Sequence, residues 1–201
     1  KKDKKNLPLI SIITVVLNNK KFLQQSINSV LNQSYKNYEL IIIDGKSTDG
    51  TVEILKKNNL KIDFWISEKD KGIYNAMNKG IKLSRGSIIS ILNSDDIFYK
   101  HALKTATNYF NRFQGIDFLF GSVIKYKLLH GYKPWKISWS FGFYSTHSIG
   151  FFIRKKAQNK VGYYNVKYKY SADYDLFYRM IVNYNMKGMA TKKKEIFGKF
   201  R

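Results

Sequence analysis

The sequence has no cysteine and only two prolines among its 201 residues. Without cysteine the chain has no disulfide framework, no thiolate nucleophile and no sulfur ligand for a metal. So few prolines exclude collagen-like and proline-rich proteins. The longest apolar run, Ile10–Leu17, is too short to span a bilayer. The first residues, KKDKKNLP, lack the apolar core of a signal peptide. We therefore expect a cytoplasmic protein.

Acidic residues are also scarce. Fourteen Asp and Glu stand against 36 Lys and Arg, which gives a net charge of +22. Such a charge attracts polyanions, so one hypothesis is a nucleic-acid or polyanion-binding module. Only five of the basic residues are arginine, however, and lysine is a generic point charge that does not read bases bidentately. We therefore expect no specific nucleic acid as a partner, but peripheral contact with an anionic membrane at the inner face of the cell membrane.

Hydrophobic periodicity in the first half of the chain alternates between strand and helix patterns. Continuous β-branched runs predict strands buried on both faces, and stripes at helical spacing predict the helices between them. Alternation with short loops predicts an α/β protein with a mostly parallel sheet. The expected strands are Ile10–Leu17, Tyr38–Ile43, Ile62–Ser67 and Ser87–Leu92, and the expected helices are Phe22–Asn32, Thr51–Lys57 and Ile73–Leu83.

The second half is less regular. We expect helices at Ala102–Phe113, Arg154–Asn159 and Ala172–Tyr184, one or two strands within Asp117–Leu129, and a strand at Glu195–Phe200. The segment Trp135–Tyr144 is dense in aromatic residues and has no clear period. Two interpretations stay open for it, an acceptor- or lipid-facing surface and ordinary core packing.

Carboxylates follow three successive strands of the expected sheet. Asp44 follows the second strand, Glu68 and Asp70 follow the third, and Asp95 and Asp96 follow the fourth. The carboxyl ends of parallel strands share one edge, where ligands of open α/β sheets bind. Clustered carboxylates repel one another without a cation, so this edge suits Mg²⁺ or Mn²⁺ with a phosphate-bearing ligand.

Two observations bear on that interpretation. Aspartates in such loops are also common turn formers and helix caps, and we expect Thr48 or Asp49 to cap the helix at Thr51–Lys57. No glycine-rich phosphate loop follows the first strand, where the sequence reads Leu17-Asn18-Asn19-Lys20. A nucleotide would therefore be bound by metal and carboxylates.

Four segments between Pro8 and Tyr99 share the order and spacing of one family. They read PLISIITVVLNN, SVLNQSYKNYELIIIDGKSTDGT, SEKDKGIYNAMNKGI and GSIISILNSDD, and SADYDLFYRM follows at Ser171–Met180. The sequence resembles the inverting family-2 nucleotide-sugar glycosyltransferases. The resemblance implies a GT-A-like, Rossmann-like three-layer α/β sandwich that forms one catalytic domain over residues 1–201. Residues of about 8–99 would bind the nucleotide-sugar, and residues of about 100–201 would bind the acceptor.

The resemblance also implies roles for residues of the first half. Thr14 and Asp44 would bound the nucleobase pocket, and Asp70 would lie close to the nucleotide. Ser94-Asp95-Asp96 stands at the family's D-x-D motif, although Asn93 replaces the first Asp of its fuller form. Asp96 would coordinate the divalent metal, Mn²⁺ or Mg²⁺, and Asp95 would face the ribose or share the metal.

Further roles fall in the second half. Asp173 would be the general base, with Asp175 as the second choice because Ala172 replaces the Glu of the family's Glu-Asp motif. His147 would lie near the acceptor or the diphosphate. A helix-start carboxylate and a structural histidine are the alternatives for these residues.

The chemistry explains these residue types. Displacing a nucleoside diphosphate from a sugar C1 atom develops negative charge, which a divalent cation stabilises. The incoming hydroxyl needs one carboxylate to take its proton. We therefore expect a hexosyltransferase that moves a sugar, by default from a UDP-sugar, to a glycan or lipid-linked acceptor in cell-surface polysaccharide biosynthesis. A nucleotidyltransferase, which also uses Asp pairs with Mg²⁺, is the weaker alternative.

Overall fold

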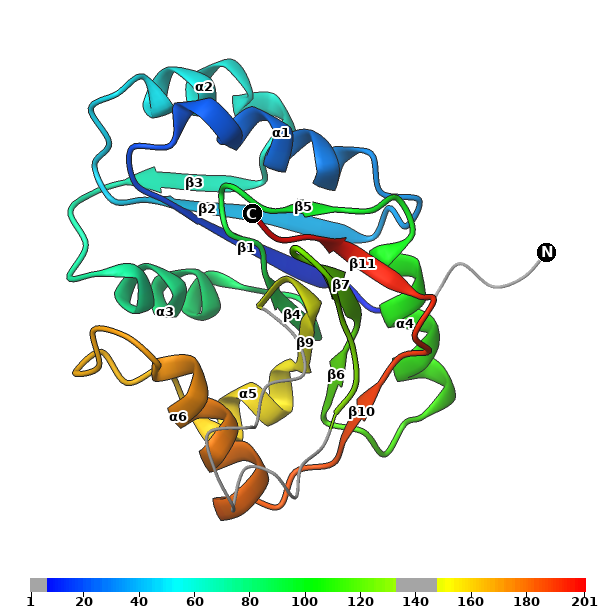
Figure 1. The fold of residues 1–201 in the computed structure, drawn as a ribbon. Coiled ribbons are helices and arrows are strands. Elements are labelled where there is room, and N and C mark those ends of the chain that lie inside the picture. Colours follow the sequence, from blue (N-terminus) through cyan, green and yellow to red (C-terminus); the bar gives the residue numbers. More distant parts are fainter. Residues whose placement is uncertain (1–6, 133–147) are drawn as a thin grey trace.

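A seven-stranded sheet with the order β10-β6-β9-β4-β1-β2-β3 lies at the centre of the fold (Figure 1). The structure is a computed structural model that describes residues 7–132 and 148–201. Only the β4–β9 and β6–β9 pairings are antiparallel, so the sheet is mostly parallel, as expected. Its strands are β1 (Ile10–Val16), β2 (Tyr38–Asp44), β3 (Phe64–Ser67), β4 (Ile88–Ile91), β6 (Phe118–Phe120), β9 (Phe151–Arg154) and β10 (Gly188–Ala190).

A smaller four-stranded sheet packs on the central one. Its order is β5-β11-β7-β8, and Phe197 of this sheet meets Phe152 of the central sheet edge to face, with ring centroids 5.2 Å apart. Its strands are β5 (Ile97–Phe98), β7 (Ser122–Ile124), β8 (Leu128–Leu129) and β11 (Ile196–Lys199). The small sheet brings the end of the chain next to the loop that follows β4.

Helices cover both faces of the central sheet and complete three layers (Figure 1). One face packs against α1 (Lys20–Leu31), α2 (Thr51–Lys57) and α4 (Ala102–Arg112). The other packs against α3 (Ile73–Leu83), α5 (Lys155–Val161) and α6 (Ala172–Tyr178), and a π-helical turn, Arg179–Asn183, continues α6. Among the described residues no helix is both long and apolar enough to cross a membrane.

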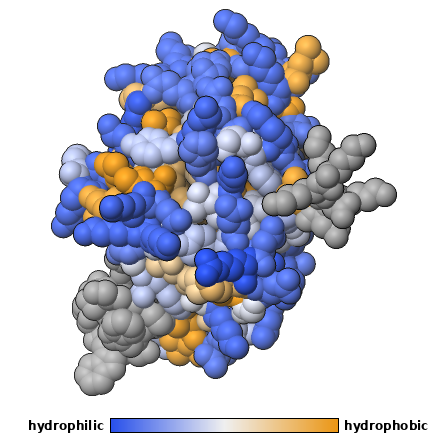
Figure 2. All heavy atoms as spheres, turned by 90° about the vertical axis from the view of Figure 1, so that its right-hand side faces the viewer, coloured by the Kyte–Doolittle hydropathy of each residue, from blue (hydrophilic) through white to orange (hydrophobic). Residues whose placement is uncertain are grey.

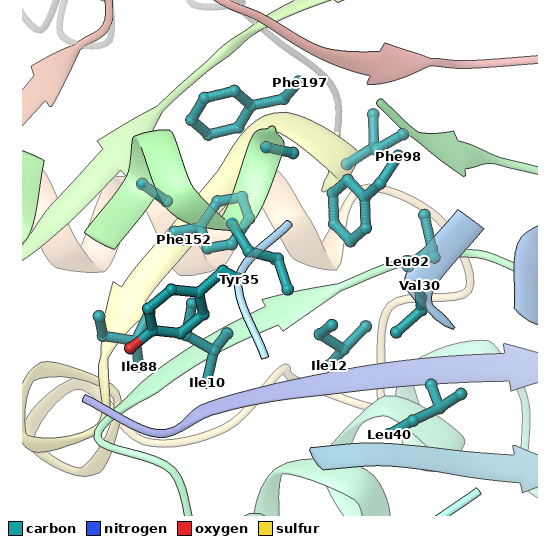
Figure 3. Packing of buried hydrophobic residues seen from close by; sticks show 14 of the residues in the cluster. Ile10, Ile12, Val30, Tyr35, Leu40, Ile88, Leu92, Phe98, Phe152 and Phe197 are labelled. Atoms are coloured by element: carbon teal, nitrogen blue, oxygen red, sulfur yellow. The ribbon is translucent and has the colours of Figure 1, made fainter. Parts of the chain in front are cut away.

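The core explains why β1 is a continuous apolar run. Ile10 and Ile12 belong to the cluster beneath α1 and α4, whereas Ile13 and Val15 belong to the cluster beneath α3. Successive side chains of a strand point to opposite faces, so a strand covered on both sides needs apolar residues throughout. Figure 3 shows Ile10 and Ile12 packed in the first cluster. Each such side chain contributes roughly 1.5–3 kcal/mol by its burial.

Close packing of α3 on β1 depends on one glycine. A Cβ atom at Gly80 would collide with the Ile13 side chain. Ala76, Met77, Asn78 and Ile81 form the rest of the buried face of α3. The sequence therefore sets α3 at a short distance from the sheet, and its first residues reach the carboxyl ends of the strands.

The expected elements of the first half are confirmed to within about two residues at each end. The expected cap of α2 at Thr48 or Asp49 is wrong, because the residue at that position is Gly50, with a φ of 101°. Asp49 lies one residue earlier, and its Oδ1 accepts the backbone N–H of Thr51 at 3.0 Å. The strands β5, β9 and β10 lie where no strand was expected. Figure 2 views the side that lies at the right in Figure 1, and hydrophilic residues cover most of that surface.

Candidate active site

A cavity of about 580 Å³ opens at the carboxyl ends of β1, β2 and β4; we call it the edge pocket. This is the edge at which open α/β sheets bind ligands, as expected. Its walls come from the ends of these strands, the start of α3 and the segment after β11. The lining residues are Val15, Val16, Leu17, Asn18, Asn19, Phe22, Gly45, Asp70, Gly72, Ile73, Ala76, Asn93, Ser94, Asp95 and Phe200.

Thr14 and Asp44, the expected base-binding residues, do not line this pocket. Both are buried, with exposed fractions of 1% and 0%. Asp44 accepts the backbone N–H of Ser47 at 3.0 Å and also binds the hydroxyls of Ser47 and Ser67. The carboxylate of Asp44 therefore stabilises the loop after β2 through hydrogen bonds to Ser47. Leu17, which is exposed, lines the edge pocket instead.

Asp70 does line the edge pocket, as the strand order predicted. Its Oδ1 lies 2.5 Å from the Nζ of Lys79, which also contacts Glu68 at 2.6 Å. Burial lowers the pKa of Lys79, but its two acidic partners more than offset this effect and raise the pKa overall. Within the described residues Asp70 Oδ2 is buried without a hydrogen bond. One oxygen of Asp70 is thus fixed by a cation, and the other is left for a ligand.

Asp95 and Asp96 differ sharply in environment. Asp95 lines the edge pocket, whereas Asp96 is fully buried and accepts the backbone N–H of Arg201 and the Nδ2–H of Asn93, each at 3.3 Å. Burial, and then the charge of Asp95, raise the pKa of Asp96 to about 7. The structure therefore turns Asp95 toward the pocket rather than Asp96, on which we expected the metal.

Oxygen atoms suited to a hard cation meet at this pocket. Asp95 and Asp70 supply carboxylates, and Asn93 Oδ1 is buried with no hydrogen bond among the described residues. No three acidic or histidine residues in the described ranges gather closely enough to bind a metal by themselves. Mg²⁺ is typically bound by one or two carboxylates plus substrate phosphates, so the residues present fit a cation that arrives with a diphosphate.

The two candidate bases also differ. Asp173 lies in the first turn of α6, and its Oδ1 accepts only the adjacent N–H of Tyr174, at 3.0 Å, in the part of the chain that the structure describes. Asp175 forms an ion pair with Arg179 at 2.9 Å. The same guanidinium donates to the carbonyls of Val161 and Tyr163. Asp175 therefore ties α6 to the end of α5, and Asp173 keeps a carboxylate that no described cation neutralises.

Tyr74 connects Asp173 with the edge pocket. It follows the lining residue Ile73, and its ring stacks on Tyr164 with centroids 5.5 Å apart. Burial, and then the charge of Asp173, raise the pKa of Tyr74. The start of α6 thus lies close to the start of α3. His147 and the aromatic segment Trp135–Tyr144 lie outside the described residues.

Several residues that line the edge pocket were not predicted from the sequence. Asn18 adopts a positive φ of 49°, and the Asn18-Asn19 pair is the sequence signal for such a turn. The side-chain Nδ2–H of Asn19 donates to the Ser94 hydroxyl at 2.8 Å, which joins the loops after β1 and β4. No sequence pattern placed Phe200 at the pocket, because it reaches the pocket through the pairing of β11 with β7.

The fold and this site define an α/β protein with a carboxylate-lined ligand pocket at the sheet edge. The family model described as Glycosyl transferase family 2 matches residues 11–172. The chain belongs to this family, as its motifs predicted.

Curated relatives agree with this assignment. An uncharacterized glycosyltransferase of Haemophilus influenzae is 39% identical over 109 residues, which is 52% of this chain and 43% of that protein. One of Rickettsia typhi is 30% identical over 189 residues, 87% of this chain and 59% of that protein. A PGL/p-HBAD biosynthesis glycosyltransferase of Mycobacterium bovis is 28% identical over 88% of this chain and 71% of that protein. The chain thus spans about half the length of the first two relatives.

Solved structures share the fold. TarS of S. aureus superposes with a TM-score of 0.78 at 18% identity, over 94% of this chain and 36% of TarS. TarS residues 1–349 in complex with UDP give a TM-score of 0.75 at 17% identity, over 95% of this chain and 60% of that one. A mannosyltransferase of Pyrobaculum calidifontis with GDP-Man and Mn²⁺ gives a TM-score of 0.73 at 14% identity, over 96% of this chain and 57% of that one. The expected GT-A fold is confirmed.

Proposed function

We propose that the protein transfers a hexose, with inversion, from a UDP-sugar to a hydroxyl of a glycan or lipid-linked acceptor in cell-surface polysaccharide biosynthesis. The observation that carries the proposal is the edge pocket, where Asp70 and Asp95 reach the cavity from the loops after β3 and β4. Its volume of about 580 Å³ falls in the usual range for small-molecule sites. The TarS structure solved with UDP supports uracil as the base.

The donor would lie across the carboxyl ends of β1, β2 and β4. Val16, Leu17 and Gly45 form the wall for the nucleobase, and buried Asp44 fixes the loop behind it. Asp95 would hold a divalent cation, with Asp70 and Asn93 as further oxygen donors on the wall of the same pocket. When bound, the cation supplies positive charge beside the leaving diphosphate.

The residues of this chain then move one proton. Asp173 takes the proton of the acceptor hydroxyl as that oxygen forms its bond to the sugar C1 atom. The bond from C1 to the diphosphate oxygen breaks on the opposite face, and its electron pair leaves with the diphosphate. One base suffices for such an in-line inversion.

The acceptor and the cell membrane are the expected partners. Lysine-rich surfaces bind anionic headgroups, so the net charge of +22 supports peripheral attachment from the cytoplasm to the inner face of the membrane. Exposed charges are screened within about 8–10 Å at physiological ionic strength, so this attachment should weaken in high salt.

A thermal-shift panel tests the donor. UDP, GDP, CDP and dTDP are each added with and without Mn²⁺, and a ligand that binds only the folded state raises the melting temperature by mass action. We expect the largest shift with UDP and Mn²⁺ together. If no nucleotide shifts the melting temperature and a DNA oligomer binds with a steep salt dependence and no metal requirement, the polyanion-binding alternative replaces the proposal.

A further inference from the structure

A second cavity, of about 170 Å³, lies beside the edge pocket; we call it the lysine cavity. Two segments far apart in the chain enclose it, residues 71–75 at the start of α3 and residues 166–169 in the loop before α6. The edge pocket and the lysine cavity share Gly72 and Ile73 in their walls. A molecule in the lysine cavity would therefore adjoin whatever occupies the edge pocket.

The wall of the lysine cavity is basic. Lys71, Lys167 and Lys169 contribute to it, and no acidic residue is part of the wall among the described residues. The ion pairs of the described ranges join Lys79 to Glu68 and Asp70, Arg85 to Glu39, and Arg179 to Asp175, and so involve none of these three lysines. Three lysines in one wall favour an anionic occupant, because an anion relieves the mutual repulsion of their charges.

The lysine cavity also adjoins the proposed base. Tyr74 is part of its wall, and the charge of Asp173 contributes to the raised pKa of Tyr74, after the larger effect of burial. Tyr168, which is half exposed, completes the opposite wall. A ligand here would thus lie next to the edge pocket, because the two cavities share Gly72 and Ile73.

We propose that the lysine cavity binds a phosphate group of the acceptor, so that the substrate which receives the sugar is a phosphate-bearing hydroxyl compound. A phosphate presents several oxygens in different directions and accepts charge-assisted hydrogen bonds from more than one ammonium group at once. The proposal rests on the proposed function, because it takes the occupant of the edge pocket to be the sugar donor. It adds the chemical class of the other substrate.

Inorganic phosphate is the first probe. Backbone amide signals of Gly72, Lys167 and Lys169 are followed by NMR while phosphate is titrated at constant ionic strength, without metal or nucleotide. We expect saturable shifts of these signals in the wild type. The double variant K167Q/K169Q should weaken the apparent affinity by about tenfold, the effect of losing two partly screened ion pairs. K193Q/K194Q removes two exposed lysines elsewhere and should leave the shifts unchanged.

Vesicles distinguish the two sources of the phosphate. Binding to phosphatidylglycerol and to phosphatidylcholine vesicles is measured for the same three proteins. If K167Q/K169Q loses affinity for both phosphate and phosphatidylglycerol, the phosphate belongs to a lipid-linked acceptor; if it loses only phosphate binding, the acceptor is not embedded in a membrane. Both results support the proposal. No saturable phosphate shift, or equal losses in the two double variants, would overturn it, as would a loss that affects vesicle binding alone.

A donor control separates this proposal from the one on which it rests. K167Q/K169Q should keep the full melting-temperature shift with UDP and Mn²⁺, because neither lysine lines the edge pocket. A wild type that shows no nucleotide shift but binds phosphate in the lysine cavity would refute the donor assignment and leave the anion site intact. Normal nucleotide shifts without phosphate binding would refute only the acceptor class.

Discussion

Asp95 and Asp96 are adjacent in the chain, yet Asp95 lines the edge pocket while Asp96 is fully buried against the backbone N–H of Arg201. The two carboxylates of one motif thus perform different tasks. One faces the ligand, and the other joins the loop after β4 to the segment after β11. Their different environments lead to opposite expectations for two isosteric substitutions.

Asp95→Asn should abolish the Mn²⁺-dependent part of the UDP-induced shift in melting temperature, because an amide is a poor replacement for a carboxylate on a hard cation. Asp96→Asn should keep most of that shift, and it should raise the stability of the apo protein by removing one of two repelling carboxylates. Thermal unfolding with and without UDP and Mn²⁺ measures both effects. If only Asp96→Asn lost the Mn²⁺-dependent part of the shift, Asp96 rather than Asp95 would be the metal ligand.

Asp173→Asn should lower turnover by about 10²–10⁴-fold, the usual range for a general base, with nearly unchanged donor affinity. The amide keeps the size and the hydrogen bond to Tyr174 but loses its basicity. Asp175→Asn should change turnover much less and instead destabilise the protein, because it breaks the pair with Arg179. Transfer kinetics and thermal unfolding of both variants decide the matter. An active Asp173→Asn beside an inactive Asp175→Asn would reverse the assignment.

Glu39 gives the fold a dependence on acid pH. Burial alone would raise its pKa, but hydrogen bonds from the Ser11 hydroxyl and from the backbone and guanidinium of Arg85 hold the pKa below its ordinary value of 4.5. A depressed carboxylate pKa adds stability that is present above the ordinary value and is lost as pH falls below it. Urea unfolding of the wild type should show this loss below about pH 4.5.

Glu39→Gln should be less stable than the wild type at pH 7, and the difference should shrink as the solution is acidified. We expect a loss of roughly 1–3 kcal/mol at neutral pH, typical of a buried carboxylate that loses charge-assisted hydrogen bonds. A constant difference between pH 7 and pH 3.5 would show that the charge of Glu39 contributes nothing.

Gly80→Ala should lower the free energy of unfolding. Alanine favours helices over glycine by about 1 kcal/mol, but its methyl group would collide with Ile13. Overpacking of a filled core typically costs about 1–3 kcal/mol, so the net change should be destabilising. Gly115→Ala is the matched control, because a Cβ atom there meets nothing within 4 Å. Urea unfolding measures the stability of both variants. A Gly80→Ala variant that is more stable than Gly115→Ala would contradict this expectation.

The sequence predicted the part of the fold that local pattern determines. The apolar run at Ile10–Leu17 and the helical stripe at Ile73–Leu83 each carry their own period, so β1 and α3 could be placed from the residues alone. β10 (Gly188–Ala190) is only three residues long, and among the described strands only β6 pairs with it, so nothing in its own sequence marks it as a strand. Short strands of this kind depend on their partners more than on propensity.

The same division holds for the site. Asp70 and Asp95 were found because they lie in the loops that follow two strands of the parallel sheet, β3 and β4. The different orientations of Asp95 and Asp96 could not be read from the chain, because the amide of Arg201 that binds Asp96 is 105 positions away. Thr14 was expected at the base, but the wall of the pocket begins one residue later, at Val15. A periodic pattern locates a strand without fixing which of its last residues reaches the ligand.

The late position of β11 has a consequence for how the pocket forms. β1 to β4 lie within the first half of the chain and are synthesised before β11. The wall at Phe200 forms only when β11 inserts between β5 and β7. Contacts of such long sequence separation form slowly. Nucleotide affinity should therefore be the last property to return on refolding, after β1 to β4 have already protected their amides from exchange with solvent.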